Sequence, residues 1–318
     1  MILGIDIGGA NTKVASSDGK FVELHYLPLW KNTRLPEALQ EIAERLVPEK
    51  VGVVITGELA DCFPDKDAGL SFIMDAVNNA FDEALFLESS GAFTKEKKRS
   101  IAAANWMAST LIVGRDFGDC IFVDTGSTTT DIIPIKDGKP LAAVTDFERL
   151  RRSELVYSGA LRTNLSALLD TVKVSGARFR ISSELFAITA DAFLVLGLIS
   201  EKDYTCDTPD GAGKTKTDAM RRLSRVVCAD LTEIDEKELV SIAAQSMEKQ
   251  VMDIADAISD VAKRHGLNKI VACGLGEFIV KKAVEELGFE IILMSERYGK
   301  ELSKVFPAYA VGRLVGEI

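Results

Sequence analysis

The feature that most constrains this chain is a glycine turn that occurs twice. The segments GIDIGGANTK at residues 4–13 and IFVDTGSTTTD at residues 121–131 both contain the pattern Asp-x-Gly-x-x-x-Thr. In each segment an apolar strand ends at the aspartate, and a second strand is expected directly after the turn. The repetition predicts a chain of two related halves, each of which opens with strand, glycine turn and strand.

Strands alternate with amphipathic helices beyond each turn, which predicts an α/β fold with largely parallel sheets. A long Ala-rich helix is expected over residues 94–114, and a helix of about thirty residues over 236–265. We place the domain boundary just after the Ala-rich helix. The predicted first domain comprises residues 1–115 and the C-terminal helix 304–318, and the second domain comprises residues 116–303.

The composition of the chain argues against several classes of function. The net charge of −10 over 318 residues disfavours binding to nucleic acid or to an anionic membrane. Five cysteines without a Cys-x-x-Cys pair, together with only two histidines, disfavour a zinc site, a disulfide framework or a His-based hydrolytic triad. The longest apolar run, residues 186–199, is too short for a membrane span and contains Asp191. We also expect no secretory leader, and therefore a cytoplasmic location.

The two turns predict a site for linked phosphate groups. A glycine turn lets the backbone approach a ligand closely, and its N–H groups can bind phosphate oxygens. An aspartate at the end of the preceding strand can hold Mg²⁺, which then bridges to phosphate. If the two turns face each other across one cleft, they can clamp a diphosphate or triphosphate. The alternative for either turn alone is an ordinary β-hairpin.

This reasoning assigns roles to named residues. The predicted catalytic residues are Asp6, Asp124, Asp131 and Lys13, and Asp6 and Asp124 are also the predicted metal ligands. Each aspartate could instead simply cap its turn, and Lys13 could point to solvent rather than to phosphate. The predicted phosphate-binding residues are Gly8, Gly9, Asn11, Thr12, Thr125, Gly126, Ser127, Thr128, Thr129, Gly274 and Gly276.

The last two of these glycines belong to VACGLGEF at residues 271–278. A strand that ends in Gly-x-Gly and continues into a helix can place a ligand over the helix N-terminus, although the same pattern also makes a tight strand-to-helix connection. Two further segments, YSGALRTN at 157–164 and the polar loop 201–218, are expected at the surface or at the active site. The predicted substrate-binding residues in these two segments are Tyr157, Arg162, Asp207 and Lys214.

Taken in order, these segments resemble the actin/hexokinase/Hsp70 superfamily. GIDIGGANTK and IFVDTGSTTTD resemble its two phosphate loops, and VACGLGEF lies where its adenosine motif belongs. The stretches IAAANWMAS and AYAVGRLVG resemble the two helices that cross at its domain hinge. The resemblance covers the whole chain. It implies a duplicated two-domain, actin-like (ribonuclease H-like) α/β fold with an interdomain cleft.

Within the superfamily the chain is similar to the hydantoinase A/oxoprolinase-like group, and in particular to a short archaeal branch linked to C1 transfer by tetrahydromethanopterin. GIDIGGANTK, IFVDTGSTTTDIIPI and YSGALRTN carry this similarity. The resemblance implies a transferase of methanofuran biosynthesis, which joins an aminomethyl-furanmethyl diphosphate to the phenol oxygen of γ-glutamyltyramine and releases diphosphate. Mg²⁺ is the expected cofactor, and the expected partners are small-molecule substrates.

Two departures from the superfamily pattern make ATP possible but not favoured. Sugar kinases use an aspartate base near the interdomain helix, where AAANWMAS offers only Asn105. Glu277 replaces a small residue of the adenosine motif and could crowd an adenine. An ATP-dependent small-molecule kinase or a hydantoinase/oxoprolinase-type amide hydrolase remains an alternative, as does a non-catalytic nucleotide-binding regulator. The sequence also leaves open whether the protein is a monomer or a homodimer.

Overall fold

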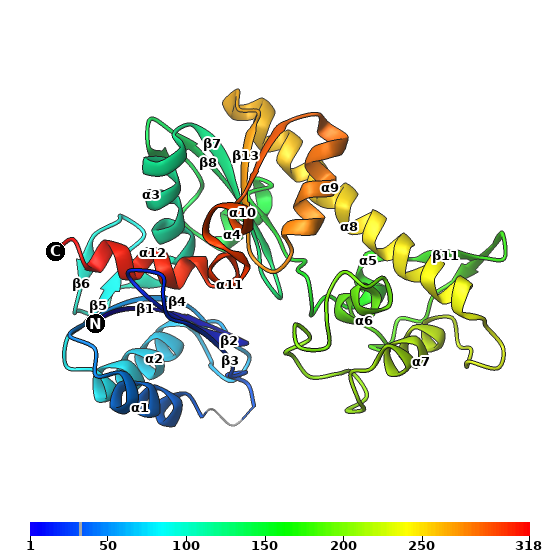
Figure 1. Cartoon of the computed structure of the whole chain (residues 1–318), viewed down its shortest axis with the longest axis horizontal. Coiled ribbons are helices and arrows are strands. Elements are labelled where there is room, and N and C mark those ends of the chain that lie inside the picture. Colours follow the sequence, from blue (N-terminus) through cyan, green and yellow to red (C-terminus); the bar gives the residue numbers. More distant parts are fainter. Residues whose placement is uncertain (32–33) are drawn as a thin grey trace. The chain divides into compact units, whose positions relative to one another are not determined.

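The computed structural model describes residues 1–31 and 34–318, which form two compact units (Figure 1). Unit 1 contains Met1–Phe122, Ile133–Arg151 and Ile292–Ile318. Unit 2 contains Val123–Ile132 and Arg152–Ile291. These units differ from the two predicted domains, because unit 1 takes in residues 116–122, 133–151 and 292–303. The predicted division into duplicated halves remains a prediction.

Unit 1 is built on a six-stranded sheet in the order β3-β2-β1-β4-β5-β6. Strand β1 pairs antiparallel with β2 and parallel with β4, as expected for a meander that leads into an α/β unit. The strands are β1 (Ile2–Gly8), β2 (Asn11–Ser16), β3 (Val22–Tyr26), β4 (Lys50–Thr56), β5 (Ala84–Leu87) and β6 (Phe93–Thr94).

Helices cover both faces of this sheet (Figure 1). Helices α1 and α2 pack together on one face, and α12 packs on β1 and β4 from the other. The helices of unit 1 are α1 (Leu35–Leu46), α2 (Lys66–Ala80), η1 (Arg99–Ile101), α3 (Asn105–Phe117), α4 (Asp146–Arg151), α10 (Met294–Tyr298), α11 (Lys300–Lys304) and α12 (Phe306–Val315).

Helix α12 approaches the sheet so closely that only glycine fits at the contact. A Cβ atom at Gly4 would lie 1.8 Å from the carbonyl oxygen of Ala308, and one at Gly52 would lie 2.7 Å from that of Val311. From the helix side, a Cβ atom at Gly312 would lie 2.9 Å from the nitrogen of Gly4. Glycines in β1, β4 and α12 therefore bring strand and helix backbones into direct contact.

The predicted helix over residues 94–114 is wrong in its extent. Between residues 94 and 104 the only helical segment is the 3-10 turn η1. Helix α3 begins at Asn105 and continues to Phe117. Ala102 forms a bridge with Ile55 of β4, and Ala103 has a φ angle of 50°, in the left-handed region. Alanine favours helix by propensity, but pairing with the end of β4 overrides that preference here.

The second sheet has the order β10-β8-β7-β13-β14, and β9 pairs with β8. Strands β7, β8 and β14 each have residues in both units. A separate hairpin, β11-β12, belongs to unit 2. The strands are β7 (Cys120–Thr125), β8 (Thr130–Lys136), β9 (Lys139–Pro140), β10 (Leu155–Val156), β11 (Thr171–Val174), β12 (Ala177–Arg180), β13 (Lys269–Cys273) and β14 (Glu290–Leu293).

Unit 2 is organised around one long helix, α8 (Glu236–His265), whose predicted extent is confirmed. The Asp235 side chain caps its start, and Gly266 ends it with a φ angle of 68°. Helices α6, α7 and α9 and the hairpin β11-β12 all contact α8. The other helices of unit 2 are α5 (Leu165–Leu168), α6 (Thr189–Val195), α7 (Lys216–Val226) and α9 (Glu277–Leu287).

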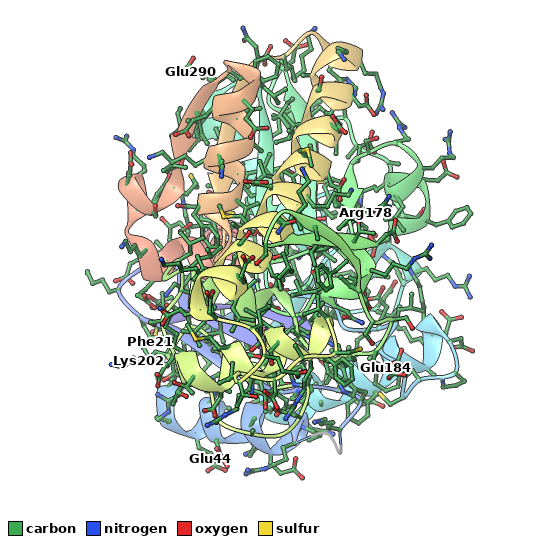
Figure 2. The ribbon with its side chains drawn as sticks, turned by 90° about the vertical axis from the view of Figure 1, so that its right-hand side faces the viewer. Phe21, Glu44, Arg178, Glu184, Lys202 and Glu290 are labelled. Atoms are coloured by element: carbon green, nitrogen blue, oxygen red, sulfur yellow. The ribbon has the colours of Figure 1, made fainter. Side chains whose placement is uncertain are left out.

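Charged side chains such as Glu44, Arg178 and Glu290 project outward from the ribbon (Figure 2). None of the helices in the described part of the chain combines the length and apolarity that a membrane crossing needs.

Candidate functional site

The first glycine turn carries an ion pair. The pairing of β1 with β2 places Asp6 directly opposite Lys13, and Lys13 Nζ donates to Asp6 Oδ2 at 3.1 Å. The Lys13 side chain is only 17% exposed. The alternative in which Lys13 points to solvent is therefore wrong, because cross-strand neighbours share one face of the sheet.

The other oxygen of the Asp6 carboxylate is unsatisfied. Asp6 is buried, and its Oδ1 atom has no hydrogen-bond partner within residues 1–31 and 34–318. Buried polar atoms without partners are rare, so this oxygen points to a ligand such as a cation. A carboxylate oxygen suits Mg²⁺, which keeps several waters and takes further ligands from phosphate. No group of three or more His, Cys, Asp or Glu side chains suited to a metal occurs among the described residues.

The glycines of the first turn differ in how tightly they are held. A Cβ atom at Gly8 would lie 3.0 Å from the carbonyl oxygen of Asn11, whereas one at Gly9 would meet nothing within 4 Å. Thr12 pairs with Ile7, one position beyond the Asp6–Lys13 pair, and is fully buried. Because neighbouring residues of a strand point to opposite faces, the Thr12 hydroxyl and Lys13 do not face the same side.

The second glycine turn is wrapped by the loop YSGALRTN. The N–H group of Ala160 donates to Gly126 O at 2.9 Å, and those of Leu161 and Arg162 donate to Ser127 O at 3.0 and 2.9 Å. Within the turn, the Gly126 N–H group donates to Thr129 O at 2.9 Å. Four backbone hydrogen bonds thus fix the shape of this turn.

Close packing makes glycine necessary in the wrapping loop. A Cβ atom at Gly159 would lie 2.5 Å from the nitrogen of Thr128. Gln250 of α8 fixes the loop by two hydrogen bonds, because its Nε2 donates to Ser158 Oγ at 2.6 Å and to Gly159 O at 2.9 Å. Sequence reasoning missed Gln250, although a polar residue within the apolar stripe of α8 was an available signal.

Of the sequence-predicted cations, Arg162 reaches the second turn. Arg162 Nη1 donates to Thr128 Oγ1 at 3.1 Å. Burial raises the pKa of the Cys206 thiol to about 11, and Arg162 and Lys214 both oppose this rise. Both cations therefore act on Cys206 within unit 2, and Lys214 Nζ also donates to Thr205 O at 3.4 Å.

The polar loop 201–218 is not wholly at the surface, and that expectation is wrong in part. Tyr204 and Cys206 are buried, and the Tyr204 hydroxyl donates to Asp191 Oδ1 at 3.0 Å. Arg222 is fully buried and donates through Nε to the same carboxylate oxygen at 2.8 Å. Burial raises the pKa of the Asp191 carboxyl, and the hydrogen bond from Arg222 opposes that rise. This buried polar cluster anchors the loop that presents Lys214.

The two glycines of VACGLGEF, Gly274 and Gly276, pack against the end of β7. A Cβ atom at Gly274 would lie 2.4 Å from Thr125 O and 2.6 Å from Asp124 Oδ1, and its φ angle is 94°. A Cβ atom at Gly276 would lie 2.2 Å from the Thr125 side chain. Packing alone accounts for both glycines, so their predicted contact with phosphate remains a prediction.

The remaining predicted residues differ in how far they are buried. Tyr157 and Asp207 are exposed, whereas Asp131 is buried in β8 opposite Leu155. Thr125 is fully buried, and Thr129 is partly buried at the end of the turn. The structure thus brings Arg162 and the second turn together in unit 2, and Asp6 and Lys13 together in unit 1.

Comparison with known families decides where the chain belongs. The family model for hydantoinase/oxoprolinase matches residues 49–316. The chain belongs to the hydantoinase/oxoprolinase family. This confirms the family expected from the glycine turns and from YSGALRTN.

Two curated relatives carry the same name. A protein of Methanocaldococcus jannaschii is 43% identical over 325 residues, which cover 99% of this chain and 97% of the relative. A protein of Methanococcus vannielii is 45% identical over 201 residues, which cover 62% of this chain and 90% of the relative. Each is named (4-{4-[2-(gamma-L-glutamylamino)ethyl]phenoxymethyl}furan-2-yl)methanamine synthase.

The fold is shared with a sugar kinase. A ROK family glucokinase from Streptomyces griseus, solved in complex with glucose and AMPPNP, superimposes with a TM-score of 0.50 and 13% sequence identity. The match covers 100% of this chain and 99% of the glucokinase. It confirms the actin-like α/β fold class for this member of the hydantoinase/oxoprolinase family.

Two positions at which this hydantoinase/oxoprolinase family member departs from the kinase pattern have visible structural roles. Asn105 is the first residue of α3, and its Oδ1 accepts the Trp106 N–H group at 2.8 Å. Glu277 is the first residue of α9 and is buried. The expected effect of Glu277 on adenine binding remains a prediction.

Proposed function

We propose that this chain is the transferase that forms the ether bond of a methanofuran precursor. It joins the furanmethyl carbon of an aminomethyl-furanmethyl diphosphate to the phenol oxygen of γ-glutamyltyramine, and diphosphate leaves. The observation that carries the proposal is the 43% identity with the M. jannaschii synthase over nearly the full length of both chains. The predicted cytoplasmic location and the oligomeric state stay predictions.

The chemistry sets two demands on the protein. The bond between the furanmethyl carbon and the diphosphate oxygen breaks, and its electron pair leaves with diphosphate. The furan ring delocalises the positive charge left on the carbon, and the phenol oxygen supplies the electron pair of the new bond. The protein must therefore stabilise charge on the leaving group and hold the phenol oxygen near the carbon.

We assign leaving-group stabilisation to the glycine turns. In unit 2, Arg162 supplies positive charge at Thr128, and charge-assisted hydrogen bonds to phosphate are among the stronger ones. Lys214 remains a predicted substrate-binding residue. In unit 1, Lys13 is held beside Asp6. Mg²⁺ at Asp6 would supply further neutralisation of the diphosphate when bound. Asp124 remains a predicted metal ligand. Asp131 remains a predicted catalytic carboxylate.

An ATP-using enzyme is the second candidate, because the superimposed glucokinase holds AMPPNP. An ATP-dependent kinase or amide hydrolase would need the nucleotide for turnover. The ether-forming transferase needs only its two substrates, since the diphosphate ester already carries the leaving group.

The test is turnover with both substrates and Mg²⁺. The transferase should form the ether without ATP and release one diphosphate per ether, measured by mass spectrometry and a diphosphate assay. Diphosphate should raise the melting temperature more than ATP does, because a ligand that binds only the folded state stabilises it. Absence of ether under these conditions, or ether formation that depends on ATP, would contradict the proposal.

A further inference from the structure

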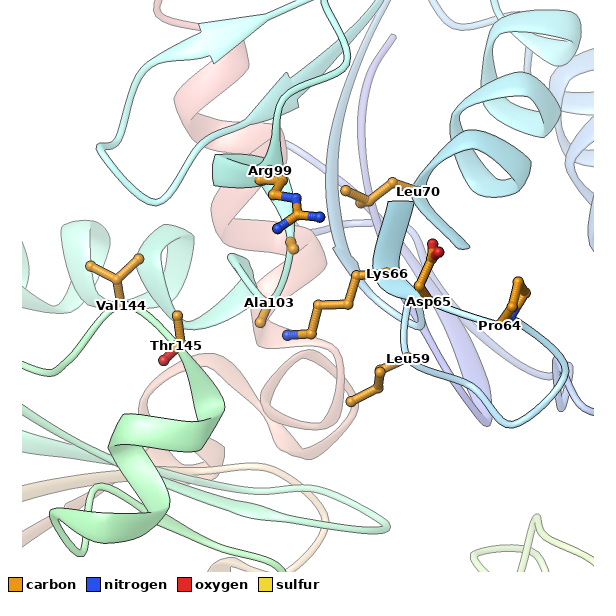
Figure 3. A pocket seen from close by; sticks show the side chains of 10 residues that line it. Leu59, Pro64, Asp65, Lys66, Leu70, Arg99, Ala103, Val144 and Thr145 are labelled. Carbon is orange, nitrogen blue, oxygen red and sulfur yellow. The ribbon is translucent and has the colours of Figure 1, made fainter. Parts of the chain in front are cut away.

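Unit 1 contains a pocket of about 530 Å³ at the carboxyl end of β4 (Figure 3). Ligands of α/β proteins commonly bind beyond the carboxyl ends of the strands, and pockets of this volume take whole small molecules. Its apolar lining includes Leu59, Leu70 and Val144, and its cations are Lys66 and Arg99. Such a wall suits a flat ring that carries one polar group.

The two cations are not equivalent. Arg99 donates to both oxygens of Asp67, at 3.1 and 2.6 Å, so its charge is already matched. Lys66 extends its ammonium group into the pocket between Leu59 and Ala103 (Figure 3). Its Nζ lies 3.6 Å from Glu58 Oε1, a looser ion pair that leaves room for a second partner.

Glu58 is an unusual carboxylate. It is only 2% exposed, and its Oε2 atom has no hydrogen-bond partner among the described residues. Burial raises the pKa of the Glu58 carboxyl above its usual value; Lys66 opposes this rise, and Asp146 adds to it. A buried carboxylate with an unused oxygen next to a lysine is a candidate for proton transfer.

Gly57 links the loop that lines the pocket to the first glycine turn within unit 1. The Gly57 N–H group donates to Ile7 O at 3.1 Å, and a Cβ atom at Gly57 would lie 3.0 Å from the Gly8 carbonyl group. Glu58 and Leu59 follow directly in the chain. A molecule in the pocket therefore lies one short loop away from the proposed diphosphate-binding turn.

We propose that this pocket binds the phenol ring of the acceptor substrate, with Lys66 beside the phenol oxygen and Glu58 as the base that takes its proton. The inference rests on the proposed function and adds the acceptor site to it. The phenol O–H bond breaks, the oxygen forms the new bond to the furanmethyl carbon, and the proton goes to Glu58. An ordinary phenol has a pKa of about 10, so a cation and a base both assist its ionisation.

The first experiment tests the base. Glu58→Gln should lower kcat with γ-glutamyltyramine by about 10²- to 10⁴-fold. The loss should be much smaller with a ring-fluorinated γ-glutamyltyramine, whose more acidic phenol needs less help. In the unmodified protein, kcat should fall as the pH drops through the raised pKa of Glu58, and this decline should disappear in the variant. Equal losses with both acceptors would overturn the role of Glu58.

The second experiment tests the pocket. Leu59 is 64% exposed, so Leu59→Trp should fill the pocket without disturbing the core. Leu59→Trp and Lys66→Met should each raise KM for γ-glutamyltyramine about tenfold and leave KM for the furan diphosphate unchanged. Lys95→Met and Glu83→Gln are matched controls, since these residues form an exposed ion pair in the same unit, at 3.2 Å. A rise in KM for the furan diphosphate instead would overturn the assignment.

Binding without turnover separates this inference from the proposed function. Calorimetry with γ-glutamyltyramine alone should show binding that Leu59→Trp weakens about tenfold. If the unmodified protein binds the acceptor in this way but forms no ether, the proposed reaction fails and the pocket assignment stands. If ether forms while Leu59→Trp binds the acceptor as tightly as the unmodified protein does, the pocket assignment fails alone.

Discussion

The two glycine turns share a sequence pattern but draw their positive charge from different parts of the chain. In the first turn, Lys13 comes from the same hairpin as Asp6 and lies opposite it. In the second turn, Arg162 comes from a loop 34 residues beyond Thr128. The repeated pattern determines the hairpin, while the cation comes from whichever segment packs against it.

This difference predicts which substitutions disturb the structure of each turn. The first turn is held by the pairing of β1 with β2 and by the N–H groups of Leu27 and Leu29, which donate to Ala10 O at 3.0 Å and to Gly9 O at 2.8 Å. The second also needs the loop 157–164, the packing of Gly159 and the hydrogen bonds from Gln250. Substitutions far along the chain from the second turn should therefore disturb it, whereas the first turn should respond mainly to changes within the first thirty or so residues.

The largest effect is expected from the two aspartates. Asp6→Asn and Asp124→Asn should each lower kcat/KM by about 10²- to 10⁴-fold, because each removes a carboxylate proposed to hold Mg²⁺. Turnover as a function of Mg²⁺ concentration measures this. The double variant then asks whether the turns serve one diphosphate: a shared ligand predicts a combined loss smaller than the product of the single losses. Turnover at the unmodified level in either variant would remove the metal assignment.

Glycine substitutions should separate the turns by stability. Gly159→Ala should destabilise the fold by about 1–3 kcal/mol, because its Cβ atom would lie 2.5 Å from the nitrogen of Thr128. Gly9→Ala should change stability by less than about 0.5 kcal/mol, because its Cβ atom meets open space. Denaturant titration measures both. Equal stabilities of the two variants would contradict the tight wrapping of the second turn.

Removing the cations should give a smaller, more selective effect. Lys13→Met and Arg162→Met should each weaken diphosphate binding about tenfold, since each removes a charge-assisted contact. Only Lys13→Met should also lower the melting temperature, because it leaves the buried Asp6 carboxylate without its counterion. Calorimetry and thermal unfolding measure these two quantities. A larger loss of stability in Arg162→Met would reverse the comparison.

The smallest effect concerns the buried thiol of Cys206. The pKa of Cys206 is raised to about 11, so at pH 8 its thiolate is scarce and alkylation should be slow relative to the exposed Cys62 and Cys228. Arg162→Met should slow it further, because Arg162 lowers this pKa. Mass spectrometry of iodoacetamide-treated protein follows each site. Faster labelling of Cys206 in the variant would show that Arg162 does not act on the thiol.

The local sequence pattern was sufficient to predict the family, the fold class and both hairpins, because a glycine turn between two strands is encoded within about ten residues. It could not decide the direction of Lys13, which depends on the register of β1 against β2. It also extended α3 backward through Ala102 and Ala103, because propensity carries no information about pairing with β4.

The parts of the site that sequence reasoning missed depend on long-range packing. Gln250 contacts a loop about ninety residues earlier in the chain, and no local pattern connects the two. Glu58 had a local signal, a carboxylate two residues after the apolar strand β4, but its packing against α2 is a long-range contact. A Cβ atom at Gly69 of that helix would lie 2.1 Å from the Glu58 carbonyl oxygen.

The glycine contact between β1 and α12 has a consequence for protein synthesis. Gly4 leaves the ribosome about three hundred residues before Gly312, yet each forms part of the other's packing surface. Until α12 has been synthesised up to Val315, the face of β1 and β4 on which it packs stays exposed. The first strand to be synthesised therefore completes its packing only with the last helix. We therefore expect unit 2, whose last segment is finished at Ile291, to become compact on the ribosome before unit 1, whose last segment ends at Ile318.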